Sequence, residues 1–515
     1  MKPALIRLSG IFILALSLAT NASGSEFHSL FDGKSLDGWN AKDMTYWSVT
    51  DGAITAESTT DHPGKKNQFL VWQLGDVDDF VLRLKFKIDG PPNANSGIQF
   101  RSVIKEEGHA VGYQADIDKQ GNWLGSVYDE HTSRKALAKR GQRLEIDNKG
   151  ERTLTDIGDA AELFKKFNSD GWNDYQITAK GSKIQIHVNG ALFSEVIDHQ
   201  SSERDFSGKL ALQLHSGPPL KVQFKDIKLK RLPLAEDRKK VVFLAGNPSH
   251  APGDHEHNAG SWLLAKCLND TVSDKIQANV YFNNGWPADP SAFDNANAIV
   301  IYCDGGGRHL ALPKLKELDA MMDKGIGLGC LHYGVEVPKG EPGDAFLDMI
   351  GGYFETHFSV NPHWIGDFKK LPDHPVTNGV KPYKIQDEWY YHMRFRPGMK
   401  GVTPILSARP PEETRTARWG YHHGGNEHVA AAKGQDEVVM WTSENNNGSR
   451  GFGFTGGHHH KNWGDENHRK VVLNAILWVA KQEVPKNGVE SIVTSEDLAT
   501  GLDDKPARKP KKKKK

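Results

Sequence analysis

The fold of the N-terminal half is decided at residues 183–196, which read KIQIHVNGALFSEV. Apolar and polar residues alternate on both sides of Asn189-Gly190, a dipeptide typical of a two-residue turn between antiparallel strands. Similar short runs recur at 46–49, 69–74, 80–88, 97–102, 112–117, 175–179, 209–215 and 222–229. Many short strands predict an all-β sandwich over residues 26–232, with one short helix inside 153–167.

A different pattern begins near residue 238, after a short linker at 231–238. KKVVFLAG at 239–246 is an uninterrupted apolar run of the kind found in buried parallel strands. We expect further strands at 278–282, 298–303 and 326–331, and helices at 259–268, 313–324 and 468–481. This alternation predicts a doubly wound, mostly parallel α/β domain over residues 238–482.

Length and charge narrow the class of protein. The chain has 515 residues, enough for two or three domains at roughly 150 residues each. The net charge is +0, but residues 1–22 carry two cations, residues 505–515 carry eight, and neither stretch has an acid, so the body is at −10. An acidic body argues against a nucleic-acid-binding face. No apolar run reaches the roughly 20 residues of a membrane span.

Both ends of the chain differ from the body. Lys2 and Arg7 precede the apolar run 11–19, and small residues follow up to Ala22, as in a secretory signal cleaved after that residue; an uncleaved anchor is the alternative. We therefore expect an exported protein, periplasmic or extracellular. Residues 483–515 lose periodicity and end in a lysine run, which predicts a disordered basic tail; adhesion to anionic envelope polymers is its functional alternative.

Three cysteines cannot make a disulfide scaffold. Cys303 and Cys330 lie in apolar, strand-like runs. We interpret them, with Cys267, as small buried hydrophobic residues rather than as a disulfide.

Four predicted strands of the first half carry polar residues two positions apart. Residues i and i+2 of a strand face the same side, so these side chains are expected on one surface, with the apolar residues between them in the core. Glutamines with an arginine and a histidine favour ligand binding over an ordinary solvated face. The eight residues are Gln99, Arg101, Gln114, Asp116, Tyr128, Glu130, Gln213 and His215.

The motifs LFDGKSLDGW (30–39), NSGIQFRS (95–102), GYQADI (112–117) and LQLHS (212–216) resemble the 3-keto-disaccharide hydrolase family, also described as 3-keto-glucoside lyases and hydratases. The resemblance covers nearly all of 26–232 and implies a concanavalin-like jelly-roll sandwich. It also implies cleavage of 3-keto-glycosides such as 3-keto-trehalose: a base removes the C2 proton, the C1 substituent is eliminated, and water adds back. An upstream sugar 3-dehydrogenase would supply such substrates.

That chemistry needs a base, an acid and a donor to the enolate oxygen. We expect Glu130 or Asp116 as base, His215 as acid or base, and Arg101 at the enolate oxygen. The residues expected to bind sugar hydroxyls are Gln99, Gln114, Tyr128 and Gln213. Asp116, Glu130 and His215 are also candidate ligands of a divalent metal. Two-carboxylate glycosidase chemistry remains the rival reaction.

The second half resembles the ThuA-like (trehalose utilisation) family of the class I glutamine amidotransferase-like superfamily, through KKVVFLAGNPSHAPGDHEHNAG, GIGLGCLHYGVE, DEWYYHMRF and GFGFTGGHHH. The resemblance covers about 240–482 and implies a flavodoxin-like sheet. In amidotransferases the strand-to-helix elbow carries a cysteine nucleophile. We place His332 at that elbow and Cys330 inside the strand, so no glutamine hydrolysis is expected.

Histidines and acids follow the predicted strands of this half, where ligands of open α/β sheets bind. We expect a second site that processes or binds a related sugar. Its candidate residues are His255, Glu256, His257, Asp304, His332, Glu388 and His458, with His255, His257, His332 and His458 as possible metal ligands. The Gly-rich stretch at 305–307 lacks the Lys-Ser/Thr of a phosphate loop.

Together these patterns predict an exported enzyme acting on oxidised di- or oligosaccharides. A carbohydrate-binding module without chemistry, fused to a ThuA-like protein, is the alternative.

Overall fold

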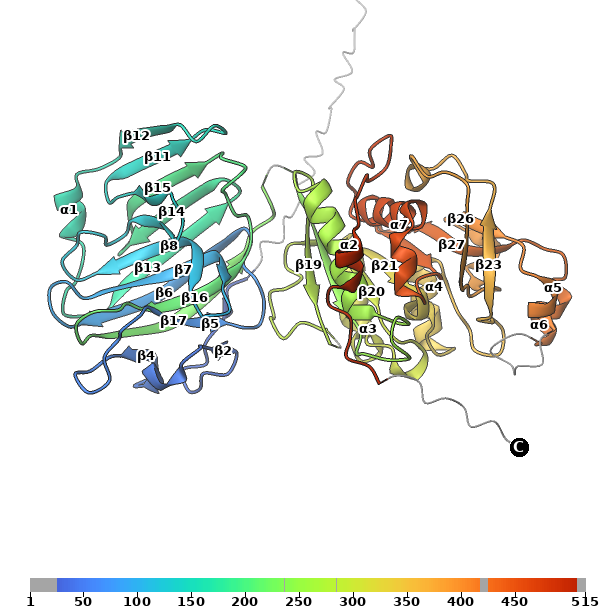
Figure 1. The fold of residues 1–515 in the computed structure, drawn as a ribbon, viewed down its shortest axis with the longest axis horizontal. Helices are drawn as coiled ribbons and strands as arrows, with labels where there is room; N and C mark the ends of the chain where they lie inside the picture. Colours follow the sequence, from blue (N-terminus) through green and yellow to red (C-terminus); the bar gives the residue numbers. More distant parts are fainter. Residues whose placement is uncertain (1–25, 236, 284, 417–424, 507–515) are drawn as a thin grey trace, which may run out of the picture.

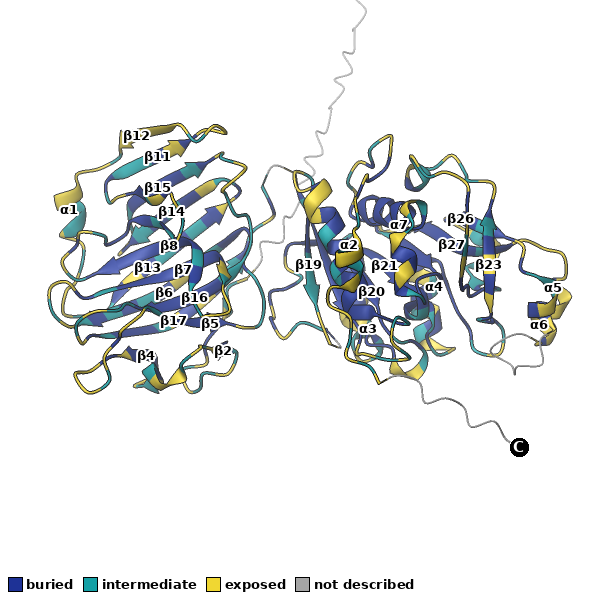
Figure 2. Ribbon diagram, viewed as in Figure 1, coloured by how far each residue is buried: buried dark blue, intermediate teal, exposed yellow. Residues whose placement is uncertain are grey.

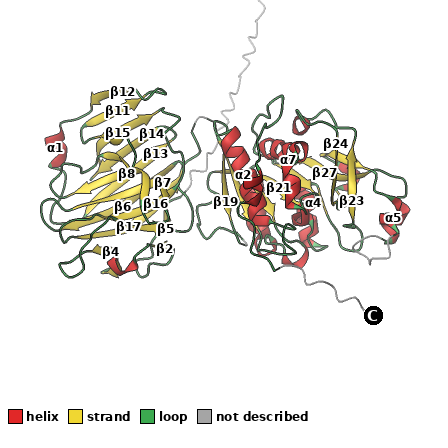
Figure 3. Cartoon of the chain, viewed as in Figure 1, coloured by secondary structure: helices red, strands yellow, loops and turns green. Residues whose placement is uncertain are grey.

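A computed structural model describes residues 26–235, 237–283, 285–416 and 425–506. The predicted signal at 1–22 lies outside the described residues. The ribbon shows a β-sandwich in blue and green beside a mixed α/β half in green to red (Figure 1). Figure 3 shows the helices confined almost entirely to the second half. The predicted fold class is confirmed for both halves.

Two sheets form the sandwich. The first runs β12 (Arg152–Asp156), β11 (Gln142–Ile146), β15 (Ala191–Asp198), β14 (Lys183–Val188), β13 (Asn173–Lys180), β6 (Phe80–Asp89), β17 (Lys221–Arg231), β4 (Ala53–Glu57) and β3 (Trp47–Thr50), with β1 (His28–Ser29) on β17. The second runs β10 (Lys135–Ala138), β9 (Val127–Glu130), β8 (Ala110–Asp118), β7 (Asn95–Ile104), β16 (Lys209–Leu214), β5 (Gln68–Trp72) and β2 (Trp39–Asn40).

The hairpin predicted at 183–196 is β14–β15. Its turn residues Asn189 and Gly190 both have left-handed φ, at 48° and 79°, as the tight turn requires. The helix expected inside 153–167 is shorter, α1 (Ala160–Phe164), because β12 occupies the start of that range. Between the sheets lies the core, which holds the predicted residues Ile98, Phe100, Tyr113, Ala115, Ile117, Leu212 and Leu214.

The α/β half is built on one seven-stranded sheet. Its order is β19 (Ile276–Tyr281), β18 (Lys239–Ala245), β20 (Ala296–Tyr302), β21 (Gly327–Leu331), β28 (Arg450–Phe454), β27 (Glu437–Glu444) and β26 (Val402–Ala408). The first five strands are parallel, and the last two pair antiparallel. Two small antiparallel pairs accompany it, β22 (Gly352–Tyr353) with β25 (Arg394–Phe395) and β23 (His363–Phe368) with β24 (Tyr383–Glu388).

The longer helices cover the sheet. They are α2 (His257–Thr271), α3 (Leu315–Asp323), α4 (Glu341–Ile350) and α7 (Glu466–Val479). Figure 2 shows the sheet strands largely buried, whereas α6 (Glu427–Ala431) lies mostly exposed at the edge, beside α5 (Glu412–Arg415), whose last two residues are buried. No helix in the described ranges combines the length and apolar character needed to span a bilayer.

The predicted disordered tail is wrong for residues 483–506. This segment carries α8 (Ser495–Ala499) and packs on the domain, with Val489 only 1% exposed. Backbone-to-side-chain bonds fix it, since Asn474 accepts from the Val489 N–H and the Arg469 guanidinium donates to Ser491. Lys505 is buried, so it is not available to anionic polymers. Residues 507–515 lie outside the described residues.

Buried charges join the two halves. Asp78 of the sandwich pairs with Arg231 at 3.1 Å and with Lys240 of the α/β half at 2.8 Å. Arg231 also pairs with Asp289 at 2.8 Å, and Asn295 donates to Asp78. Burial alone would raise the pKa of Asp78, but the two cations hold it far below its usual range. All four charged side chains have at most 1% of their surface exposed, so each depends on the others for compensation.

Candidate functional site

The first candidate site is the polar face of the sandwich, on the second sheet. Gln99 of β7 lies opposite Gln114 of β8, which lies opposite Tyr128 of β9. Glu130 pairs with Gly112 one step along the same strands. All eight predicted residues come from the neighbouring strands β7, β8, β9 and β16 or the residue just after β16, although the Arg101 side chain bonds elsewhere.

The centre of this face is bonded within itself. Ser102 donates to Gln99, Gln99 donates to Gln114 at 2.7 Å, and Gln114 donates to Asp116 at 2.7 Å. Gln99, Gln114 and Asp116 are at most 4% exposed. Burial raises the pKa of Asp116 well above its usual range, so this carboxyl is not the ready base that the sequence suggested.

Titratable groups reach solvent at the rim of the face. The Glu130 side chain is 14% exposed, and its carboxylate lies 3.5 Å from His131. Burial raises the pKa of Glu130, although His131 and His215 act in the opposite direction. The Ser216 carbonyl accepts from Nδ1 of His215 at 2.6 Å, which leaves Nε2 of the neutral ring as a proton acceptor.

Gln213 is the one glutamine of the face without amide partners among the described residues. Both its Nε2 and Oε1 are buried and unbonded there, while its backbone carbonyl accepts from Ser96. A buried amide costs free energy unless it is bonded, so Gln213 is suited to an incoming polar ligand.

Arg101 does not belong to this site, contrary to the prediction. Its guanidinium donates to the Asp79 carboxylate at 2.7 Å and to the carbonyls of Asp78 and Gly181, and it is 1% exposed. The cause is a break in the β7–β8 register after Gln99, with Arg101 at a left-handed φ of 49°. Such an irregularity changes which side of the sheet the following side chains face, so the i, i+2 rule no longer predicts the face of residues beyond it.

The metal site suggested on the sandwich is also wrong. Within the described residues, Asp116, Glu130 and His215 are not among the groups whose ligand atoms gather within 4.8 Å. The fixed bond of Asp116 to Gln114 holds its carboxyl in the buried row, away from the rim.

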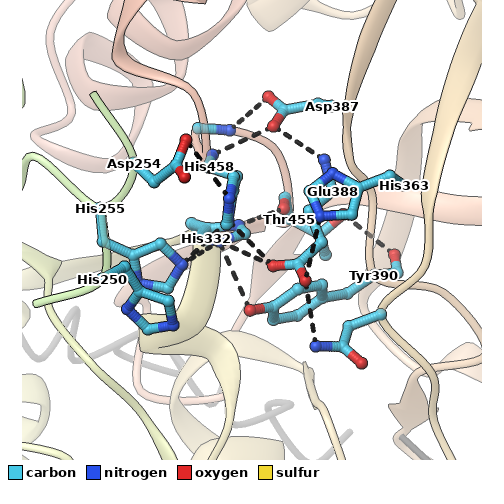
Figure 4. Close-up of polar contacts among 12 residues, drawn as sticks. His250, Asp254, His255, His332, His363, Asp387, Glu388, Tyr390, Thr455 and His458 are labelled. Carbon is cyan, nitrogen blue, oxygen red and sulfur yellow. Dashed lines mark hydrogen bonds and ion pairs between the residues drawn. The ribbon is translucent and has the colours of Figure 1, made fainter. Parts of the chain in front are cut away.

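The second candidate site gathers side chains after four strands of the α/β half, and we call it the histidine cluster: His255, His332, Glu388 and His458. His255 follows β18, His332 follows β21, Glu388 ends β24, and His458 follows β28. Figure 4 shows these side chains pointing toward one another. All four are at most 7% exposed.

The ligand atoms of the histidine cluster form a closed ring. Nε2 of His255 lies 3.0 Å from Nε2 of His332 and 3.0 Å from Nδ1 of His458. The Glu388 carboxylate lies 3.0 Å from the same atom of His458 and 3.5 Å from that of His332. Ligands about 2.1 Å from one ion are separated by about 3.0 Å at right angles and about 3.4 Å in a tetrahedron, so the ring has the size of a metal site.

The outer nitrogen of each imidazole meets an acceptor. His332 donates from Nδ1 to the Thr455 carbonyl at 2.9 Å, and Nδ1 of His255 faces the Asp304 carboxylate at 3.2 Å. Nε2 of His458 faces Asp254 at 3.6 Å. These acceptors hold the ring protons on the nitrogens that point away from the centre of the cluster. In the neutral ring, the nitrogen that points toward the centre therefore carries a lone pair. Three lone pairs and a carboxylate at these separations repel one another unless a cation lies between them.

The fit therefore favours a divalent transition-metal ion with three nitrogen ligands and one oxygen ligand. Burial, with the neighbouring imidazoles, pushes the pKa of His255 far below its usual range and keeps that ring neutral. At His458 burial has the same tendency, but bonds to Asp254 and Glu388 raise the pKa to about 9, so this ring holds a proton when no ion is bound.

The other residues predicted for this site have outer roles. His257 is outside the ring: its Nε2 is not among the gathered ligand atoms and lies 3.9 Å from Asp304, while its Nδ1 bonds the Asn247 carbonyl. Glu388 takes the fourth place. Asp304 orients His255. Glu256 is a structural anion, paired with the Lys505 ammonium at 3.0 Å.

The elbow after β21 is as predicted. Cys330 lies within the strand, fully buried and unpaired, and burial raises its thiol pKa well above the usual range. His332 follows with a left-handed φ of 51°, a strained conformation for a residue with a side chain. Its ring lies at the end of the strand, where Nδ1 bonds the Thr455 carbonyl.

Sequence reasoning missed several neighbours of the histidine cluster. The Tyr390 hydroxyl lies 3.4 Å from Nε2 of His332, and Asp387 accepts from the backbone N–H groups of Gly457 and His458. Both belong to the DEWYYH run that had contributed Glu388. Glu336 and Tyr333, from the GLGCLHYGVE motif, lie beside Tyr390.

Comparisons with known proteins agree with this division. Residues 26–230 match the family model of the 3-keto-alpha-glucoside-1,2-lyase-like domain, and residues 259–479 match that of the trehalose utilisation family, ThuA. No curated protein matches the chain.

Solved structures resemble each half. A carbohydrate-binding module from Bacillus subtilis is 16% identical, with a TM-score of 0.26, over 38% of this chain and 95% of that chain. A beta-glucanase from Bacillus licheniformis is 10% identical, with a TM-score of 0.25, over 41% and 98%. A ThuA-like protein from Parabacteroides merdae is 15% identical, with a TM-score of 0.34, over 51% and 99%. These likenesses say nothing of activity. The chain therefore matches the models of two sugar-related families, the 3-keto-alpha-glucoside-1,2-lyase-like domain and then ThuA, over successive parts of one polypeptide.

Proposed function

We propose that the protein is an exported enzyme that cleaves 3-keto-glycosides on the polar face of the sandwich. One observation carries the proposal: Glu130, at the rim, has a raised carboxyl pKa and lies near an imidazole, His215, whose Nε2 is available. The family match of residues 26–230 supports the substrate class. The signal-like residues 1–22 support export, and a sugar 3-dehydrogenase would supply the ketone.

The ketone at C3 makes the C2 proton acidic. The Glu130 carboxylate takes this proton, the C–H electron pair forms a C2–C3 double bond, and the carbonyl π pair moves onto oxygen as an enolate. The ketone then re-forms while the C1–C2 double bond forms and the C1–O bond breaks with its electrons on the departing oxygen. When its ring carries a second proton, His215 gives that oxygen the proton on Nε2, and Nε2 takes one back from the water that adds. Water then adds across the double bond, so the net reaction is hydrolysis.

The enolate oxygen needs a hydrogen-bond donor, and Arg101 is committed elsewhere. The Gln213 amide takes this role in the proposal, because its Nε2 is buried and unbonded among the described residues. A preformed donor at the developing charge stabilises the transition state more than the ground state. Gln99, Gln114 and Asp116 hold the face rigid rather than bind the sugar.

The test compares a 3-keto-glycoside with its parent glycoside on the full-length protein. Glu130→Gln and His215→Ala should each lower turnover of the keto sugar by roughly 10²–10⁴, the usual contribution of a general acid or base. Glu145→Gln, an exposed glutamate on the other sheet, is the matched control and should leave the rate unchanged. Equal rates on the keto and parent sugars would instead indicate two-carboxylate glycosidase chemistry.

A carbohydrate-binding module is the competing function, favoured by the internally bonded centre of the face. It predicts that keto sugars bind without turnover and that Glu130→Gln changes affinity alone. Calorimetric binding measured beside product release separates the two functions.

A further inference from the structure

The histidine cluster has chemistry on its open side that the sandwich reaction does not use. Tyr390 contacts His332, and the Tyr333 ring centroid lies 5.9 Å from that of His255 and 6.3 Å from that of Tyr390. Glu336 lies among them, partly exposed, and interacts electrostatically with Glu388 and Tyr390. A carboxyl and two phenols thus border a set of four metal ligands.

The backbone holds Glu336 in place. Its carbonyl accepts from the Gly306 N–H at 2.9 Å, and its N–H donates to the Tyr333 carbonyl at 3.0 Å. Thr356 donates to the carboxylate at 3.1 Å. No cation pairs with this carboxylate among the described residues. Burial raises the pKa of Glu336 to about 7, and the Glu388 charge adds to the effect, opposed by the bond from Thr356.

We propose that the histidine cluster and Glu336 form a second catalytic centre, in which a divalent transition-metal ion binds an α-hydroxy-ketone sugar and Glu336 moves a proton on carbon. The choice of an oxidised sugar rests on the proposed function of the sandwich. The centre itself rests on the geometry of the cluster.

The surroundings select a neutral chelating ligand rather than an anion. Asp254, Asp304 and Glu336 border the cluster in addition to the ligand Glu388. Two side-chain cations lie near it: Arg308 is 75% exposed and 3.6 Å from Asp304, and the buried Lys505 ammonium is bonded to the carbonyls of Asp254 and His255. Carboxylates repel phosphorylated sugars, whereas adjacent carbonyl and hydroxyl oxygens of an uncharged sugar can occupy open positions of the ion.

The proposed step is balanced without an oxidant or reductant. The Glu336 carboxylate takes the proton from the carbon that bears the hydroxyl group. The C–H electron pair forms a carbon–carbon double bond, and the carbonyl π pair moves onto oxygen, where the bound cation offsets the charge. If the proton returns to the opposite face of the same carbon, the ketone re-forms and the sugar is epimerised. If it is delivered to the former carbonyl carbon, the hydroxyl proton moves to the former carbonyl oxygen, the hydroxyl-bearing carbon becomes the new carbonyl, and the sugar is isomerised.

Metal binding is tested first. Full-length protein is stripped with a chelator and titrated with Co²⁺, followed by calorimetry and by the visible spectrum of the ion. We expect one ion per chain, and His332→Ala or Glu388→Gln should weaken its binding by more than about 100-fold. His187→Ala, on β14 of the sandwich, should bind normally. A wild-type chain that binds no Co²⁺, or ligand variants that bind like wild type, would overturn the centre.

Proton transfer is tested by deuterium exchange into carbon. Methyl 3-keto-glucoside is incubated in D₂O with the Co²⁺-loaded Glu130→Gln variant, in which the sandwich reaction is slowed, and the ring protons are followed by NMR. Adding Glu336→Gln should slow exchange by roughly 10²–10⁴ while Co²⁺ affinity is retained. Adding Glu341→Gln, an exposed glutamate on α4, should change nothing.

The two proposals fail separately. Exchange that persists at full rate in the Glu336→Gln variant, or proceeds equally without Co²⁺, would overturn the second centre. A lack of glycoside cleavage by the wild-type protein bears on the sandwich alone, because exchange at carbon and metal binding are measured without it.

Discussion

On the sandwich face, the central side chains bond one another, from Ser102 through Gln99 and Gln114 to Asp116. In the histidine cluster, by contrast, every outer imidazole nitrogen faces an acceptor, and the inner nitrogens face one another and the Glu388 carboxylate. Polar side chains that hydrogen-bond one another keep a fixed arrangement without a ligand. Side chains that are hydrogen-bonded only on their outer side need a ligand on the inner side. This difference supports the proposal that Gln213 and Glu130, rather than the central row, act on the substrate.

The largest expected difference between the two sites is that a metal ion stabilises the folded protein through the histidine cluster and not through the sandwich face. At an ion concentration 1,000 times the Kd, a site that binds only in the folded state adds about 4 kcal/mol to the free energy of unfolding. Hydrogen exchange followed by mass spectrometry should show added protection in peptides from β18, β21 and β28. Comparable direct protection of β7–β9 in a His332→Ala chain would show that the sandwich face binds metal as well.

A second prediction concerns the segment behind His255. The Lys505 ammonium donates to the carbonyls of Asp254, at 2.7 Å, and His255, at 3.2 Å, and is 3% exposed. Lys505→Met should weaken Co²⁺ binding by about 10–100-fold, as loss of outer support does at other metal sites. Lys486→Met, exposed in the same C-terminal segment, serves as the control in the same calorimetric titration. Unchanged affinity in the Lys505 variant would mean that the loop holds His255 without this clamp.

The smallest expected effect lies at Asp116. Because its folded-state pKa is raised above the ordinary 3.8, the native state holds the proton more tightly than the unfolded chain. The carboxyl therefore favours folding less as pH rises from about 4 toward its folded-state pKa. Asp116→Asn keeps the bond from Gln114, so it should change stability by under about 1 kcal/mol at pH 4 and become relatively more stable as pH rises. Guanidinium unfolding of both proteins across that range checks the sign, and a gap that shrinks with pH would contradict it.

The alternation of residues predicted much of the sandwich, because core residues such as Ile98 and Leu212 obey a two-residue period. It failed at Arg101, since a local change in backbone register is not encoded in that period. In the second half, the positions of His255, His332 and His458 after strands were sufficient to bring them together. His257 was misplaced because a helix begins there, and Glu388 comes from a strand outside the main sheet.

Side-chain bonds to the backbone explain the remaining errors. The segment 483–506 lacks hydrophobic periodicity, yet Asn474, Arg469 and the Glu256–Lys505 pair fix it in place. Glu336 escaped notice for a similar reason, since neither its burial nor its neighbour Glu388 can be inferred from local sequence.

The buried ion pairs between the two halves limit how these domains can be recombined with others. Asp78 and Arg231 belong to the sandwich, while Lys240, Asp289 and Asn295 belong to the α/β half. Asp78 and Arg231 would keep each other, but transplanting either half would remove the Asp78–Lys240 and Arg231–Asp289 pairs across the buried boundary. Removing one partner of a buried pair costs about 3–5 kcal/mol. The two domains are therefore not freely interchangeable. A recombined chain folds well only if its new partner supplies matching charges at this boundary, and an engineered fusion of either half should first replace its buried charged residues there with neutral ones.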